Sequence, residues 1–403
     1  MWKLALRNVF RHKGRTAMTL LVIIIGVVGL ILSGGFVHDI FKQLAEVLIH
    51  SQSGHLQVSR NGYFASGTRS PEKFLIGDPE PLRAAIAAKP GVRDVMGRLY
   101  FAGLLNNGRS DLPILGEGVE PARESKLGSS VVIKQGRALE DKDAYGIMIG
   151  HGLALTLKLK PGDWTTLVIN TPDGALNSLE FQVVGVFQTF SKDYDARAVR
   201  IPLPAAQELL ATQGVNTLVV SLQHTLDTGL VASALGKQLA PDGLEVKTWL
   251  ELNEFYTQTV EMYDAQFGVL RIIILLMVLL SVANSVNMSV FERVGEFGTM
   301  MALGNRGRRI FALILMENLI IGLIGASIGV ALGSLLAVAI SAIGIPMPPP
   351  PNSDLPYTAH ILIIPSVIAL AFAVGLIATV AASLLPALRV RRIPVVDALR
   401  QSI

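Results

Sequence analysis

The feature that most constrains this chain is a run of 21 uncharged residues at positions 17–37. A helix rises 1.5 Å per residue, so the run covers about 31 Å, which matches a hydrocarbon core of about 30 Å. The 15 residues before the run hold five Lys or Arg and no acid. Because the run is longer than the apolar region of a signal peptide, we predict an uncleaved membrane anchor over residues 1–37.

Further apolar runs come only after residue 267 and predict spans at 272–291, 310–344 and 361–388. The third run is long enough for one tilted or protruding helix or for two spans. With four spans, the N-terminal segment, the loop 292–309 and the tail from Arg389 share one side and hold 13 Lys or Arg against 3 acids. The loop 341–360 has no Lys or Arg. The positive-inside rule then predicts four spans with both termini in the cytoplasm.

The segment 38–266 is predicted to be a large extracytoplasmic domain. It holds 21 Lys or Arg and 26 acids, an ordinary soluble balance, and long domains cross a membrane largely regardless of charge. About 230 residues are enough to bury a core. Its two ends, 38–50 and 250–267, continue the neighbouring spans as amphipathic helices, which predicts a stalk between the domain and the membrane helices.

The pattern inside this domain predicts an α+β fold. Residues 216–222, 228–239 and 244–248 are candidates for a strand, a helix and a strand. Earlier in the chain, 56–59, 92–105 and 112–118 are strand candidates, and 81–88 is a helix candidate. Such units, split around an insert, indicate a ferredoxin-like body. Residues 119–202 read as nearly all strand, with turn signals at 161–163 and 171–174. We therefore predict an inserted β subdomain over about 119–202.

The sequence lacks the residues that common catalytic and metal sites need. There is no cysteine, no P-loop pattern and no HExxH pair, and the G-x-S-x-G match at 325–329 lies inside an apolar run rather than at the strand-to-helix turn of a nucleophile elbow. The seven histidines show no ligand spacing. No catalytic residue, metal site or cofactor is therefore predicted within this chain.

The loop 292–309 is predicted to form a short amphipathic helix closed by Gly304. Its apolar side would carry Val294, Phe297, Met300, Met301 and Leu303, and its rim Glu292, Arg293 and Glu296. Such a helix can lie on lipid headgroups or dock into a groove of another protein. The residues alone leave both interpretations open.

A glycine stripe and a carboxylate lie inside the predicted third span, and each has more than one interpretation. Gly325, Gly329 and Gly333 form a small-residue stripe, which serves either intrachain packing or a dimer and sliding contact. Glu317 lies just inside the third span, where a carboxylate is costly. It is predicted to be a structural hydrogen-bonding group, a proton site or a coupling contact. Its predicted partners near the inner end of span two are Asn284, Ser285 and Asn287. The Pro348–Pro351 run predicts a stiff outer loop.

Three stretches resemble the MacB/FtsX/LolC-type (type VII) ABC transporter permeases. They are LALRNVFRHKGRTAMTLL at 4–21, SVNMSVFERVGEFGTMMALGNRGRRIF at 285–311 and LLPALRVRRIPVVDALR at 384–400. The second matches the family's E-R-x-x-E loop after span two, and the third its closing motif. The segments GHLQVSRNGYF and IPMPPPP are most similar to the lipoprotein-release (LolC/LolE-like) permeases. The predicted outer domain has the size of the MacB and LolC type rather than the smaller FtsX type.

This resemblance implies a transporter membrane subunit that is not itself an enzyme. A separate ABC ATPase dimer would bind ATP and Mg, and the loop helix (Glu292, Arg293, Glu296, Phe297, Met300, Gly304) would dock on it. A second permease copy or a homologue would complete the inner-membrane complex. The implied work is mechanical release of lipoprotein or lipid, with a lipoprotein, a lipid or a periplasmic adaptor as a further partner. The alternatives are export of peptides or macrolide-like compounds, and FtsX-like regulation of a cell-wall enzyme.

Overall fold

A computed structural model describes residues 2–11, 13–67, 71–127, 131–171, 174–349 and 356–391. The chain divides into two compact units. The membrane unit comprises Met1–Lys42, Thr259–Met347 and Thr358–Ile403, and the α+β unit comprises Gln43–Gln258 and Pro348–Tyr357. The predicted turn at 171–174, the Pro348–Pro351 loop and the tail beyond Arg391 lie wholly or partly outside the described residues.

The described residues contain four helices long and apolar enough to cross a membrane, as predicted. They are α2 (Lys13–Leu48), α10 (Glu254–Glu292), α12 (Gly307–Ile343) and α13 (Pro365–Arg391). The third run is a single helix, α12, and not two spans. Helices α2 and α10 both continue well beyond the predicted spans. Helix α13 begins at Pro365 rather than at residue 361, because proline suits the first turn of a helix.

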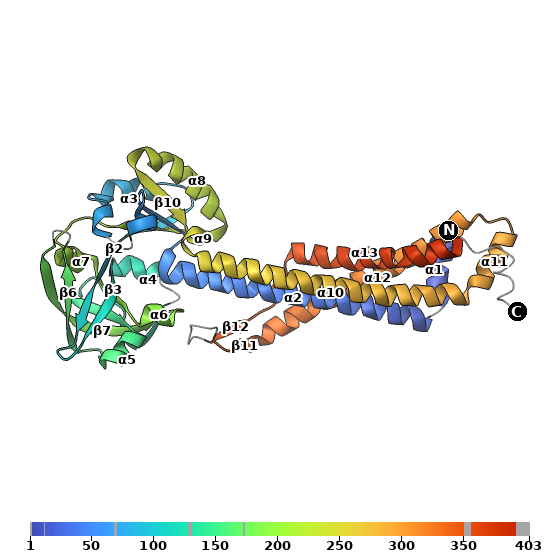
Figure 1. Ribbon diagram of the computed structural model, residues 1–403, viewed down its shortest axis with the longest axis horizontal. Helices are drawn as coiled ribbons and strands as arrows, with labels where there is room; N and C mark the ends of the chain where they lie inside the picture. The colour runs from blue at the N-terminus through green and yellow to red at the C-terminus, as the bar shows by residue number, and fades with distance from the viewer. Residues whose placement is uncertain are drawn as a thin grey trace. The chain divides into compact units, whose positions relative to one another are not determined.

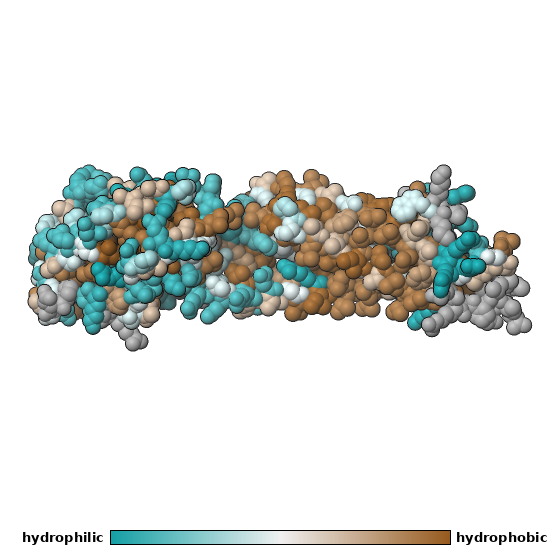
Figure 2. Space-filling model, turned by 90° about the horizontal axis from the view of Figure 1, so that it is seen from above, coloured by the Kyte–Doolittle hydropathy of each residue, from teal (hydrophilic) through white to brown (hydrophobic). Residues whose placement is uncertain are grey.

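The membrane helices pack around a shared apolar core (Figure 1). Its buried residues include Ile23 and Val27 of α2, Val282 of α10, Ile314 of α12 and Ala378 of α13. Large apolar side chains such as Leu280 and Ile377 remain exposed on the outside of these helices, and the surface of the helices is mostly hydrophobic (Figure 2). An apolar exterior of this kind fits a lipid solvent.

The glycine stripe of α12 packs against α2 of the same chain. A Cβ added at Gly325 would lie 3.0 Å from Ile23, one at Gly329 2.8 Å from Val27, and one at Gly333 3.0 Å from Ile31. Small residues at this spacing let two helix backbones approach closely. Of the two uses left open by the sequence, the structure shows intrachain packing.

Two short helices complete the membrane unit. Helix α1 (Trp2–Arg11) packs Ala5 and Val9 against Leu313 and Ile320 of α12. Helix α11 (Val294–Ala302) follows α10. The N–H of Gly304 donates to the Met301 carbonyl (3.0 Å), and the N–H of Asn305 donates to the Met300 carbonyl (3.1 Å). This is a Schellman ending, with Gly304 at φ +88° as the left-handed residue.

The first half of the α+β unit is the predicted ferredoxin-like body. Strands β1 (Leu56–Arg60), β2 (Val92–Asn106), β9 (Thr217–Leu222) and β10 (Leu244–Thr248) lie in the order β10-β1-β9-β2. All three pairings are antiparallel. Helices α3 (Pro79–Ala87) and α8 (Thr228–Leu239) connect β1 to β2 and β9 to β10. The chain order and strand order are those of a split β-α-β unit pair.

The inserted part begins inside β2 and not near residue 119 as predicted. Residues 92–98 of β2 pair with β9, whereas residues 99–106 pair with β3 (Asp111–Val119). The prediction missed this boundary because one 15-residue strand serves both halves. Strand pairing then follows the order β2-β3-β8-β5-β7-β6, and β6 pairs with β2 again, so the strands of the insert form a closed ring. Closure removes exposed sheet edges from this ring.

The insert contains more helix than predicted, since residues 119–202 were predicted to be nearly all strand. Its other strands are β4 (Val132–Gly136), β5 (Gly146–Gly150), β6 (Trp164–Asn170), β7 (Leu176–Gln188) and β8 (Ala198–Pro202). Its helices are α4 (Pro121–Leu127), α5 (His151–Leu157), α6 (Lys192–Asp195) and α7 (Leu203–Leu210). Elsewhere lie α9 (Trp249–Leu252), β11 (Ile345–Met347) and β12 (Tyr357–Ala359). One continuous apolar core, from Leu56 to Leu239, fills both halves of the α+β unit.

We predict that Gly329→Leu destabilises the membrane unit by about 1–3 kcal/mol, because the new side chain must displace Val27 of α2. The measurement is thermal unfolding in detergent, monitored as the loss of monodisperse protein. Gly29→Leu is the matched control, since no atom lies within 4 Å of its added Cβ. Equal melting temperatures for the two variants would contradict close packing at Gly329.

Candidate functional site

A buried carboxylate joins three helical segments of the membrane unit. Glu317 of α12 is 8% exposed. Arg293, between α10 and α11, donates from Nη1 to Oε2 (2.8 Å) and from Nη2 to Oε1 (3.3 Å). Asn8 of α1 donates from Nδ2 to Oε1 (2.6 Å). One side chain of α12 therefore holds both α1 and the start of α11.

Further contacts fix the direction of the Arg293 side chain. Its guanidinium lies over the Phe297 ring, 5.1 Å from the centroid, and its Nε donates to Glu296 (3.2 Å). Glu296 also pairs with Arg11 of α1 (3.3 Å). A bidentate, charge-assisted pair is strong and directional. Removing either partner would leave a buried charge uncompensated, so the pair fixes α11 on the bundle.

Two residues predicted for docking are instead buried in this chain. Phe297 is 1% exposed within the core of the membrane unit, and Arg293 is 6% exposed. The prediction that Phe297 anchors in a partner's groove and that Arg293 lies on the rim is therefore wrong. The bundle buries that apolar face itself, because Phe297 and Val294 face the core. Met300 is half-buried.

The residues on the exposed side of α11 differ from those predicted. Glu292, Thr299, Leu303 and Gly304 are exposed, and the side chain of Glu296 is partly exposed. Leu303 is 80% exposed although it is a large apolar residue. These residues form the exposed surface of the α10–α12 connection, and we call them the α11 outer face.

Among the described residues, the hydrogen bonds of Glu317 go to Asn8 and Arg293 and not to the predicted partners on α10. Asn284 is exposed, Asn287 is half-buried, and the Ser285 hydroxyl lies 2.6 Å from the Thr19 hydroxyl of α2. The prediction was wrong because Arg293 offers Glu317 an opposite charge as well as hydrogen bonds. Asn8 was missed, although it is an amide within the otherwise apolar and basic stretch LALRNVFR.

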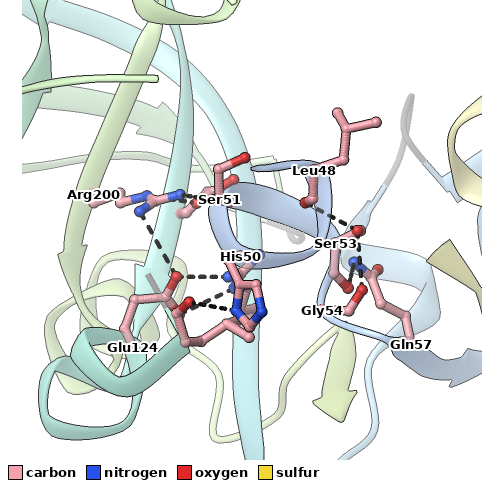
Figure 3. A network of polar contacts seen from close by, with 11 residues as sticks. Leu48, His50, Ser51, Ser53, Gly54, Gln57, Glu124 and Arg200 are labelled. Carbon is pink, nitrogen blue, oxygen red and sulfur yellow. Dashed lines mark hydrogen bonds and ion pairs between the residues drawn. The ribbon is translucent and has the colours of Figure 1, made fainter. Parts of the chain in front are cut away.

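A second buried polar cluster lies in the α+β unit, where the chain leaves α2. A π-helical turn, η1 (Ile49–Ser53), follows α2. The Ser51 carbonyl accepts a hydrogen bond from Arg200 Nη2 (2.9 Å), and the Ser53 hydroxyl donates to the Leu48 carbonyl (3.2 Å). Figure 3 shows Arg200 reaching this turn from its strand. Strand β8 therefore holds the end of α2 through one arginine.

Arg200 belongs to a cluster of four buried charges with Arg98, Glu117 and Glu124. Arg200 Nε donates to Glu117 (3.0 Å) and Nη1 lies 3.7 Å from Glu124. Arg98 Nη2 donates to Glu124 (2.6 Å). Burial opposes ionisation of Glu117, but Arg200 and Arg98 outweigh it and hold its pKa below the usual range. No local pattern in the sequence predicts this cluster, because the four charges lie far apart along the chain.

Sequence comparison agrees with this architecture. The profile of the MacB-like periplasmic core domain matches residues 16–238. The profile of the FtsX-like permease C-terminal region matches residues 268–395. The chain belongs to the MacB/FtsX/LolC-type family of ABC transporter permeases. The permease is thus a membrane protein with an extracytoplasmic α+β domain.

Individual relatives match this permease at low identity. It is 27% identical to the uncharacterized ABC transporter permease YvrN of Bacillus subtilis, over 99% of this chain and 98% of that protein. It is 23% identical to the lipoprotein-releasing system transmembrane protein LolE of Haemophilus influenzae, over 78% of this chain and 74% of LolE. It is 28% identical to an uncharacterized permease of Methanocaldococcus jannaschii, over 55% of each chain. The match thus spans about half the length of that last relative.

We predict that Glu317→Leu in this permease costs about 3–5 kcal/mol, because it leaves Arg293 charged and unpaired in the bundle. The double variant Glu317→Leu/Arg293→Met should recover a large part of that loss. The measurement is a double-mutant cycle by thermal unfolding. Additive losses in the double variant would show that the two side chains are not coupled.

A pH dependence is expected from His55, which follows η1. Burial and the nearby His50 lower the pKa of His55 to about 4. The pKa of an unfolded histidine is about 6.5, so as the pH falls the unfolded state binds the proton before the folded state does. The stability from neutral His55 is complete above about pH 6.5 and falls as the pH drops toward about 4. Melting curves against pH should show a shallower acid loss for His55→Asn; identical slopes would contradict the assignment.

Proposed function

We propose that this permease transmits work from a separate ABC ATPase subunit to cargo on the extracytoplasmic side of the membrane. The observation that carries the proposal is the Glu317–Arg293 pair, which fixes α11 on α12. A short helix fixed in this way cannot yield independently when a partner pushes on it. Force on the α11 outer face would therefore pass into the membrane helices.

The charge distribution supports a cytoplasmic position for α11 in this proposal. The loop 292–309 and both terminal segments carry the excess of Lys and Arg, and cytoplasmic segments carry such an excess. A partner ATPase would then meet Glu292, Glu296 and Leu303 from the cytoplasm. ATP and Mg would bind in that partner. Two permease copies, or this chain and a homologue, would sit on two ATPase subunits.

Packing within the membrane unit offers a path for the motion. Helix α12 lies against α2 along Gly325, Gly329 and Gly333, and a Cβ at Gly26 of α2 would meet Val278 of α10 at 2.7 Å. Helix α2 continues without interruption to Leu48. Its end is held in the α+β unit by the bond from Arg200 to the Ser51 carbonyl. Movement of α2 would thus reach the sheet through a rigid, charge-assisted contact.

The cargo that we propose is a lipoprotein or a lipid. The support is the similarity to LolE, whose name describes a lipoprotein-releasing system, over 78% of this chain. Mechanical release on the far side of the membrane needs no aqueous pore through the bundle. The apolar core of the membrane unit is consistent with that kind of work.

We predict that Leu303→Glu reduces the association with the ATPase subunit at least tenfold, because it replaces the exposed large apolar residue of the α11 outer face with a charge. The measurement is co-purification of the co-expressed ATPase from solubilised membranes. Leu230→Glu on α8 is the matched control, since Leu230 is 76% exposed and lies in the α+β unit.

A loss of ATPase docking must be distinguished from a loss of folding. Phe297→Ala should lower the melting temperature, because it empties a core position, and it is therefore unsuited to a docking test. Unchanged ATPase association of a folded Leu303→Glu variant would contradict docking through this face.

A further inference from the structure

The α+β unit contains a cavity of about 450 Å³ next to the buried charge cluster. This volume lies within the range of about 300–1,000 Å³ that small-molecule sites have. Five aromatic residues contribute to its lining: Tyr63, Phe64, Tyr100, Phe101 and Tyr194. Tyr63 and Phe64 meet edge to face, with ring centroids 5.3 Å apart. The cavity is therefore an aromatic-walled site within one unit of the chain.

Glu117 is the one charged side chain among the described residues that line this cavity. It is 6% exposed, and the guanidinium groups of Arg200 and Arg98 keep it ionised. Arg200 itself does not line the cavity; its guanidinium is bonded to Glu117, to the Ser51 carbonyl and to Glu124. The cavity wall thus presents a carboxylate, and the cation that stabilises it lies behind.

The hydroxyl group of Tyr194 adds a second polar feature to the wall. Its oxygen is buried and interacts with the Glu117 carboxylate. Burial, together with the Glu117 charge, raises the pKa of Tyr194 well above its usual value, so the phenol stays neutral.

The rim of the cavity extends the apolar surface outward. Strands β2 and β3 pair Tyr100 with Glu117 and Ala102 with Leu115. All four residues line the cavity, and Leu115 is 50% exposed. A ligand held at Glu117 could therefore lay an apolar body along Leu115.

We propose that this cavity binds an organic cation with an apolar body, whose protonated amine lies between the aromatic rings and the Glu117 carboxylate. Aromatic faces attract cations through the ring quadrupole, and the attraction increases when water is excluded. The carboxylate adds a specific charge partner, and Leu115 adds apolar contact. Such a site goes beyond the proposed function, because transmission of force from an ATPase does not require it.

Three dansyl probes of equal length test the charge preference. Dansylcadaverine carries a terminal amine, and its analogues carry a hydroxyl or a carboxylate at the same position. Each probe is titrated against the full-length permease in lipid nanodiscs, and the emission shift of the dansyl group is recorded. Empty nanodiscs of the same lipid give the membrane background. We expect saturable binding of the amine, at least tenfold tighter than that of the alcohol or the carboxylate.

Rim variants locate the bound probe without disturbing the buried charges. Leu115→Lys should weaken amine binding at least tenfold by repulsion, and Leu115→Gln should weaken it less. Leu176→Lys is the matched control, because Leu176 is 74% exposed and does not line the cavity. The proposal is overturned by equal affinity for amine and alcohol, by equal losses in Leu115→Lys and Leu176→Lys, or by binding no greater than that of empty nanodiscs. Melting temperatures confirm that each variant is folded.

Discussion

The pairing of Glu317 with Arg293 is the interaction on which the membrane unit most depends. Both side chains are buried, so each would carry a large desolvation cost if the other were absent. Their bidentate contact, with Asn8 on the same carboxylate, satisfies the charge of Glu317. The cost of separating them adds to the apolar packing of Ala5, Val9 and Phe297 that holds α1 and α11 against α12. The ion pair gives this packing a fixed direction.

The α+β unit uses a related device where α2 ends. There Arg200 holds the Ser51 carbonyl, and Glu117 and Glu124 hold Arg200. In both units a buried arginine lies where a long helix ends, and carboxylates on other elements fix the arginine. Arginine suits this position because its planar, always charged fork can serve several acceptors at once. The two clusters give the proposed transmission a rigid contact within each unit.

Much of this architecture could be predicted from the sequence, and the failures have a physical pattern. The four spans followed from apolar length, and the ferredoxin-like body followed from the strand and helix periodicity around residues 216–248. The inserted subdomain was placed too late, because nothing in the local pattern of β2 shows that its two halves join different partners. Periodicity reports which face is apolar, but not which surface covers it. For that reason Phe297 was recognised as an anchor and assigned to a partner, although this chain's own bundle buries it.

The most direct test of the account asks whether α11 moves as one body with α12. The chain has no cysteine, so spin labels can be attached at Thr299→Cys on α11 and Leu332→Cys on α12 in the native background. Pulsed electron–electron double resonance then measures the distance between the two labels within one permease copy in the complex with the ATPase, with and without ATP, after dilution with unlabelled permease suppresses distances between copies. The account predicts one narrow distance distribution in both states, which broadens when Glu317→Leu removes the ion pair. A distance that changes with ATP while Glu317 and Arg293 are intact would contradict it.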